Sequence, residues 1–123
     1  MRILIAVLLL ATSLGACASA GGGGARVDRN VMTLEQIEEA DQTNLYDLIR
    51  VHRPNWLNAR GPNSFRSENP IMVYLDGTRF GDIEELRSIS PYDVREIRFL
   101  SAAQAQARYG LGNTRGAIAI TSR

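Results

Sequence analysis

The stretch Ile71-Met-Val-Tyr-Leu-Asp-Gly77 decides the fold. A continuous apolar run closed by Asp-Gly is typical of a buried strand leading into a tight turn, because Asp and Gly accept the positive φ angles of a hairpin. The turn predicts a short returning strand over Thr78 to Phe80. Glu96-Ile-Arg-Phe-Leu100 alternates apolar and polar residues, which predicts a strand with one face in water. Ala117-Ile-Ala-Ile-Thr121 predicts a last strand, and its small residues suit a central place in the sheet.

Two helices are predicted before the first of these strands. The capping-box spacing of Thr33 and Gln36 predicts a helix that begins at Leu34. A second helix is capped by Thr43 or Asn44 and ends before Pro54. The side chains expected on the apolar faces are Leu34, Ile37 and Ala40 in the first helix, and Leu45, Leu48, Ile49 and His52 in the second.

The rest of the chain alternates between loop and helix signals. Asn55 to Pro70 reads as a loop from which Trp56 and Leu57 turn inward. Ile83 and Leu86 indicate a short helix, and Ser90-Pro91-Tyr92-Asp93 has a cap before a proline at the first helical position. Ser101 and Gln104 form another capping box, for a helix over Ala102 to Tyr109 stopped by Gly110. We therefore expect an α+β fold, a small mixed sheet covered by short helices on at least one face, with no barrel.

The N-terminal segment predicts export and a lipid anchor. Met1 and Arg2 precede the apolar run Ile3 to Ala11, which has the length of a signal-peptide core rather than of a membrane span. Leu14-Gly-Ala-Cys17 resembles the lipobox of bacterial lipoproteins, which implies cleavage after residue 16 and diacylglycerol on the Cys17 thiol. The alternative is a secreted protein with one unpaired thiol. Ala18 is not the Asp that often retains such proteins at the inner membrane, so the expected place is the outer membrane.

The expected organisation is a signal peptide over residues 1–16, a lipidated and glycine-rich tether over 17–31 and one domain over 32–123. The four glycines Gly21 to Gly24 make the tether flexible.

The composition argues against several activities. The 14 basic residues, all arginines, stand against 13 acidic ones at a net charge of +1, which gives no reason to expect nucleic acid as a partner. Without lysine, Schiff-base chemistry and a lysine-dependent phosphate loop are excluded within this sequence. One histidine and one cysteine are too few for a zinc site or a Cys/His dyad. We therefore expect no metal, no cofactor and no catalytic activity.

Other polar groups have structural readings. His52 falls at a helix C-terminus, where the helix dipole favours positive charge. The acidic residues near the first helix are expected on its solvated face; they are Glu35, Glu38, Glu39 and Asp41. Gly110-x-Gly112 follows a helix rather than linking a strand to one, so it lacks the context of a nucleotide-binding loop.

Several fragments form one ordered pattern across the chain. They are Thr33-Leu-Glu-Gln-Ile37, Asn44-Leu-Tyr-Asp-Leu-Ile49, Arg60-Gly61, Pro70 to Gly77, Leu86 to Leu100, Ala105 to Gly110 and Gly116 to Thr121. In order and spacing this set resembles the plug domain of TonB-dependent outer-membrane receptors. The fold-signature positions implied by the resemblance are Asp76, Gly77, Tyr109, Gly110 and Gly116. An exposed loop containing Arg60, Asn63, Arg66 and Glu68 would lie where receptor plugs meet ligand, or would be a plain solvated connection.

The resemblance implies a stand-alone module. A receptor barrel of 22 strands needs more than about 200 residues, so this sequence is not expected to transport by itself. Only Ala25 to Val31 could pair with the energy-transducing protein TonB, and it lacks a convincing match to the segment that does so. We expect a lipid-anchored, periplasm-facing, non-catalytic protein-binding module, accessory to TonB-dependent transport, whose partner is an envelope protein, either a barrel or an energy-transducing component. The alternative is a lipoprotein that binds a siderophore or glycan through the Arg60 to Glu68 loop.

Overall fold

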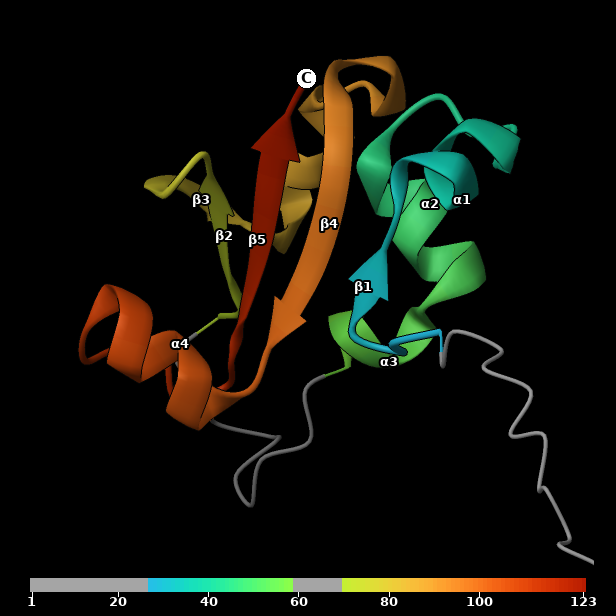
Figure 1. Cartoon of the computed structure of the whole chain (residues 1–123). Helices are drawn as coiled ribbons and strands as arrows, with labels where there is room; N and C mark the ends of the chain where they lie inside the picture. Colours follow the sequence, from blue (N-terminus) through green and yellow to red (C-terminus); the bar gives the residue numbers. More distant parts are fainter. Residues whose placement is uncertain (1–26, 59–69) are drawn as a thin grey trace, which may run out of the picture.

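The structure, a computed structural model, describes residues 27–58 and 70–123. One open five-stranded sheet has the order β1-β4-β5-β2-β3 (Figure 1). β5 runs parallel to β2, and the other neighbouring pairs are antiparallel. The strands are β1 (Val31–Met32), β2 (Met72–Leu75), β3 (Thr78–Asp82), β4 (Val94–Leu100) and β5 (Ala117–Ser122). The predicted α+β class with a small mixed sheet is confirmed, and β5 occupies the central place expected for it.

Helices cover the sheet unequally. They are α1 (Leu34–Glu39), α2 (Leu45–His52), α3 (Pro54–Leu57) and α4 (Ala102–Tyr109), with the 3-10 helices η1 (Ile83–Ser88) and η2 (Pro91–Asp93). The α1, α2, α3 and η1 segments share one apolar cluster with the sheet, whereas α4 packs on the other face (Figure 1). Among the described helices, the second face is therefore covered by α4.

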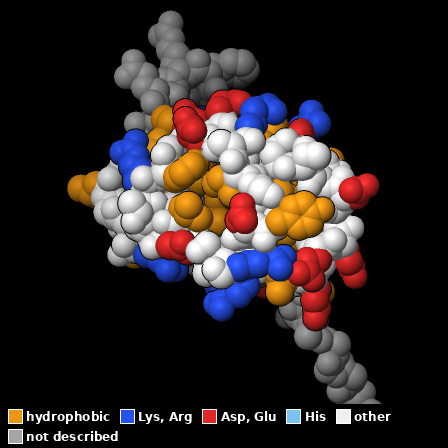
Figure 2. Space-filling view, turned by 90° about the horizontal axis from the view of Figure 1, so that it is seen from above, with side chains coloured by type: hydrophobic (Ala, Val, Ile, Leu, Met, Phe, Trp, Pro, Cys, Tyr) orange, Lys and Arg blue, Asp and Glu red, His pale blue; other side chains and the backbone are white. Residues whose placement is uncertain are grey.

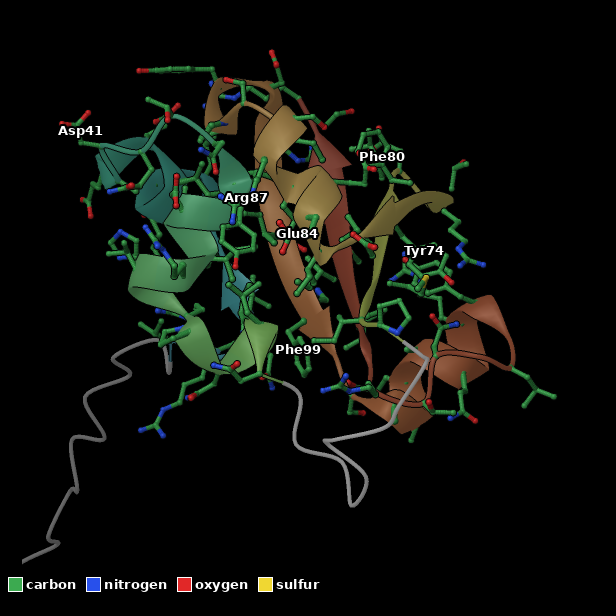
Figure 3. All side chains as sticks on the ribbon, turned by 180° about the vertical axis from the view of Figure 1, so that it is seen from behind. Asp41, Tyr74, Phe80, Glu84, Arg87 and Phe99 are labelled. Carbon is green, nitrogen blue, oxygen red and sulfur yellow. The ribbon has the colours of Figure 1, made fainter. Side chains whose placement is uncertain are left out.

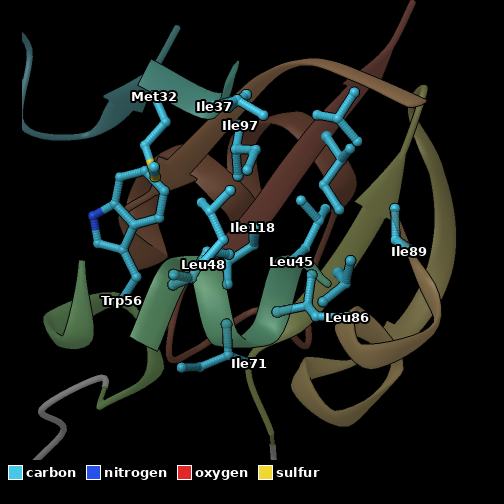
Figure 4. Packing of buried hydrophobic residues seen from close by; sticks show 14 residues of the cluster. Met32, Ile37, Leu45, Leu48, Trp56, Ile71, Leu86, Ile89, Ile97 and Ile118 are labelled. Atoms are coloured by element: carbon cyan, nitrogen blue, oxygen red, sulfur yellow. The ribbon is translucent and has the colours of Figure 1, made fainter. Parts of the chain in front are cut away.

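The main core fills the space between α2 and the sheet (Figure 4). Leu45, Leu48 and Ile49 of α2 are fully buried there, which confirms the predicted apolar face of this helix. The other buried members are Met32, Ile37, Trp56, Ile71, Val73, Leu86, Ile89, Val94, Ile97, Ile118 and Ile120. A smaller cluster under α4 contains Met72, Tyr74, Leu100, Ala105 and Ala117.

The local signals for helix starts are confirmed. In α1 the Thr33 backbone N–H donates to Gln36 Oε1 at 3.2 Å. Asn44, rather than Thr43, caps α2, and its Oδ1 accepts from the Asp47 backbone N–H at 2.9 Å. Such side-chain caps satisfy backbone groups that the first helical turn leaves without partners. The same holds at α4, whose cap Ser101 and residue Gln104 bond reciprocally at 3.0 and 3.4 Å.

The loop prediction over Asn55 to Pro70 is wrong for its first residues. Pro54 ends α2 as predicted but also occupies the first position of α3, where its fixed φ suits a helix and its missing N–H costs nothing. Trp56 is buried and Leu57 packs partly against the core, as expected.

Two burial predictions are also wrong. Leu34 is only half-buried, because Ile37 takes the inward position of this short helix. His52 is exposed, since α2 ends at this residue and the apolar face stops at Ile49.

The two-residue strand β1 was not predicted. Val31 and Met32 pair with Arg98 and Ile97 of β4. Val31, the last residue of the segment considered for TonB pairing, is therefore already part of the sheet.

The alternation in β4 is interrupted by an irregularity in its register between Val94 and Glu96. As a result Val94 and Ile97 both reach the main core, although they are three residues apart. Arg98 is exposed, as predicted for the solvated face, but Leu100 at the strand end is buried in the cluster under α4.

Candidate functional site

The sequence-predicted site residues fall into two groups. Cys17, Arg60, Asn63, Arg66 and Glu68 lie outside the described residues. The five fold-signature residues are described, and three of them, Asp76, Gly77 and Tyr109, border a hollow on the face of the sheet where α4 packs, which we call the far face.

Asp76 and Gly77 form the predicted turn between β2 and β3, with φ angles of 48° and 84°. The Asp76 carboxylate also joins this turn to the end of β5. It accepts from the Ser122 hydroxyl at 2.7 Å and from the Ser122 backbone N–H at 2.9 Å. These hydrogen bonds to Ser122, the hydroxyl first, lower the pKa of Asp76 below its ordinary value.

Tyr109 stacks on Tyr74 of β2, with ring centroids 3.6 Å apart and planes 5° from parallel. The Tyr74 hydroxyl donates to Asn113 Oδ1 at 3.0 Å, and Asn113 Nδ2 donates to the Gly110 carbonyl at 3.0 Å. Asn113 is only 3% exposed, so these bonds satisfy a polar side chain inside the fold. The network fixes α4 and the following loop against β2, and Figure 3 shows Tyr74 near α4.

Gly110 and Gly116 both adopt positive φ, at 91° and 93°. A Cβ on Gly110 would meet nothing within 4 Å, whereas a Cβ on Gly116 would lie 2.5 Å from the Leu100 carbonyl oxygen. Gly110 therefore allows the positive φ angle with which the chain leaves α4. Gly116 allows the same φ angle and also lets β5 approach β4 closely.

Asp76, Gly77 and Tyr109 border a small hollow on the far face, about 420 Å³ in volume. Its floor includes Ala119 of β5, and its charged members are Asp76, Glu96, Arg98 and Arg108. Glu96 Oε1 accepts from Arg98 Nη2 at 3.1 Å, so these two charges pair with each other. The hollow is a mixed-charge surface with a small-residue floor.

A larger hollow, which we call the α2–α3 hollow, lies where α2 meets α3. Its volume is about 1270 Å³. The lining residues are 27–30, 52–56 and Phe99. The Trp56 and Phe99 rings stack with centroids 6.0 Å apart and planes at 21°. The cationic members are Arg29 and Arg53, and His52 is also present.

Arg53 has an unusual environment in this hollow. Its Nη1 donates to the His52 carbonyl at 2.9 Å, while its Nε is buried without a hydrogen-bond partner among the described residues. The sequence gives no signal for this environment, because it predicts only that α2 ends before Pro54 and not that a second helix follows at once.

The remaining charged groups near the helices are structural. Arg87 of η1 lies with its guanidinium carbon 3.7 Å from the centre of the Tyr46 ring and donates from Nε to Glu84 Oε2 at 2.9 Å. The Glu84 hydrogen bond raises the pKa of Arg87 above its ordinary value. Figure 3 shows Arg87 and Glu84 together beside α2. Arg87 thus joins η1 to α2.

The acidic residues of the α1 region are exposed, as predicted; they are Glu35, Glu38, Glu39 and Asp41. Glu38 Oε1 accepts from Arg123 Nη2 at 2.9 Å. Within residues 27–58 and 70–123 no three His, Cys, Asp or Glu side chains are grouped to hold a metal ion.

No protein-family model, no curated protein and no solved structure matches this chain. Among the helices of the described ranges, none has both the length and the apolar character needed to cross a membrane.

Proposed function

We propose that this protein is a lipid-anchored, periplasm-facing module that binds another envelope protein and catalyses no reaction. In this proposal Cys17 carries the lipid at the outer membrane. The partner is a barrel protein or an energy-transducing component of TonB-dependent transport.

The positions of the plug-pattern residues support the family part of the proposal. Asp76 ties a turn to the end of β5, Tyr109 stacks on β2, and Gly116 permits close strand approach. At these three positions the contacts within the fold limit which residue types can replace the one present. That each of these pattern residues has a structural role is what supports the family part of the proposal.

One observation carries the binding part of the proposal, namely the exposed aromatic residues at the end of the sheet where the C-terminus lies. Tyr92 of η2 is 79% exposed, and it stands two residues before Val94, which pairs with Ser122. Phe80 of β3 is 42% exposed, close to the turn that Asp76 joins to Ser122. Figure 2 views this end and shows hydrophobic side chains near its middle with charged side chains around them.

An arrangement of this kind suits protein contact. Aromatic side chains are enriched among the residues that dominate binding energy, and a polar rim commonly surrounds them. The described chain begins toward the opposite end, beside α3 (Figure 1). A tether leaving from that side would allow the aromatic end to face away from the membrane.

The test is purification of the tagged chain, with whatever it binds, from crosslinked envelopes of cells that produce it. Tyr92→Ser is compared with Leu111→Ser, a matched change at a residue that is 93% exposed in the loop after α4. We expect an envelope protein to be recovered with the unmodified chain and with Leu111→Ser, and several-fold less with Tyr92→Ser. Recovery of no partner, or equal recovery with both variants, would contradict the proposal.

A further inference from the structure

We propose that the α2–α3 hollow is a binding site for a small organic anion that carries a carboxylate next to an aromatic or apolar ring. This inference goes beyond protein binding and does not depend on it.

The first support is positive charge that the described residues leave without a counter-ion. Neither Arg29 nor Arg53 forms an ion pair with a carboxylate of residues 27–58 or 70–123. The carboxylate on the rim, Asp28, accepts from the Asn30 backbone N–H at 2.9 Å and so shapes the turn that precedes β1. The lining of the hollow therefore includes two arginines that form no ion pair within the described ranges, beside one carboxylate, that of Asp28.

The second support is the buried donor of Arg53. A buried donor without an acceptor is costly, and such groups are rare in folded proteins unless a ligand, an ion or water completes them. Among residues 27–58 and 70–123, the guanidinium of Arg53 has one hydrogen bond, from Nη1 to the His52 carbonyl. A carboxylate can accept from a guanidinium in two parallel hydrogen bonds, so a ligand of this class offers acceptors that the described residues do not supply to Arg53.

The third support is an apolar plane beside the charge. Phe99 is half-buried and stacks on Trp56, which is 4% exposed. In Figure 3 Phe99 lies at the end of the molecule where α3 is located. Asn55, a neutral polar residue, also lines the hollow. Ligand sites typically combine an apolar surface with a few polar groups that set orientation. The volume of about 1270 Å³ is ample for a molecule of this type.

Trp56 is the single tryptophan of the sequence and lines this hollow, so its fluorescence is the probe of binding in the folded chain. The probes are N-acetylphenylalanine, which has the carboxylate and the ring, and its neutral amide, which keeps the ring and loses the charge. The purified full chain is titrated with each probe to millimolar concentrations. We expect a saturable change in Trp56 fluorescence with N-acetylphenylalanine. The neutral amide is expected to bind about tenfold more weakly, because it cannot form the charge-assisted hydrogen bond.

Variants locate the site. Arg29→Gln and Arg53→Gln are each expected to weaken binding of N-acetylphenylalanine about tenfold. Arg95→Gln, at an exposed arginine of β4 outside the hollow, is the matched control and is expected to bind as the unmodified chain does. Arg53 also holds the α2–α3 corner, so Arg29→Gln keeps the test decisive if Arg53→Gln fails to fold.

Several results would overturn the inference. They are no saturation with the acid, equal binding of the amide, or an equal loss with Arg95→Gln. The inference also fails if N-acetylphenylalanine does not change the Trp56 fluorescence while the chain binds vesicles of anionic phosphatidylglycerol and not of phosphatidylcholine. In that case Arg29→Gln would weaken the binding to the anionic vesicles. The arginines would then serve a membrane surface.

Discussion

Replacing Gly116 with alanine tests the packing of β5 against β4. The new Cβ would lie 2.5 Å from the Leu100 carbonyl oxygen and 3.1 Å from Phe99 Cζ. The carbonyl belongs to the backbone of a paired strand, so it cannot swing aside as a flexible side chain would. The substitution therefore forces either strand separation or distortion of the β4–β5 ladder.

The loss in the free energy of unfolding that we expect for Gly116→Ala has three contributions. A non-glycine residue at this positive φ costs about 1–3 kcal/mol, and overpacking adds about 1–3 kcal/mol. Alanine also restricts the unfolded chain, which returns about 0.4–1 kcal/mol. Together these contributions give a net loss of about 1–5.6 kcal/mol, which is a large fraction of the stability of about 5–15 kcal/mol that is typical of a domain.

Gly110→Ala is the matched control, because φ is 91° at Gly110 and 93° at Gly116 while nothing lies within 4 Å of the Cβ position at Gly110. Because the two φ angles match, the difference between the two variants is expected to come mainly from the clash, at about 1–3 kcal/mol. The stability of both variants is measured by urea unfolding followed through Trp56 fluorescence. The free energy of unfolding falls by about 1–3 kcal/mol per molar urea, so the midpoints of the two variants are expected to differ by about 1 M. Equal midpoints for the two variants would refute the close approach of β5 to Leu100.

Three further outcomes are expected. Because the pKa of Asp76 is lowered in the fold, its contribution to stability is present above the ordinary Asp value of about 3.9 and is lost as the pH falls through the lower folded value. The urea midpoint of Asp76→Asn is therefore expected to fall less between pH 6 and pH 3 than that of the unmodified chain; an equal fall would contradict the tie to Ser122. Tyr74→Phe leaves Asn113 Oδ1 without its donor and is expected to cost about 1–3 kcal/mol in urea unfolding; an additive result with Asn113→Ala in a double-mutant cycle would show that the two side chains do not interact. Cys17→Ser is expected to abolish labelling by radioactive palmitate and to release the chain from sedimented membranes; unchanged labelling would exclude Cys17 as the anchor.

Local sequence signals were sufficient for most elements. Ser101 with Gln104 marked the start of α4, and Asp76-Gly77 marked the hairpin, because the interacting groups are only a few residues apart. Strand β1 had no such signal, since two residues show no periodicity and it exists only through pairing with β4. Helix α3 was missed because a proline that ends one helix can equally begin the next.

The candidate sites depend on contacts between distant parts of the chain. Asp76 binds Ser122 across 46 residues, and the Tyr74 hydroxyl reaches Asn113 across 39. The α2–α3 hollow combines the residues before β1, the α2–α3 corner and Phe99 of β4. The sequence indicated that Trp56 turns inward, but only the fold places Arg29 and Arg53 near it. Glycine at position 116 was predicted as a fold signature, while its near contact with Leu100 became visible only in the sheet.

The most direct test of protein binding is photo-crosslinking in intact cells from a benzoylphenylalanine placed at Tyr92, with the same replacement at Leu111 as the control. Mass spectrometry of the adducts identifies whatever lies against each position. The account predicts a covalent adduct with a barrel or energy-transducing envelope protein from position 92 and none with that protein from position 111. Adducts with lipid or with the chain itself alone, or the same partner from both positions, would contradict it.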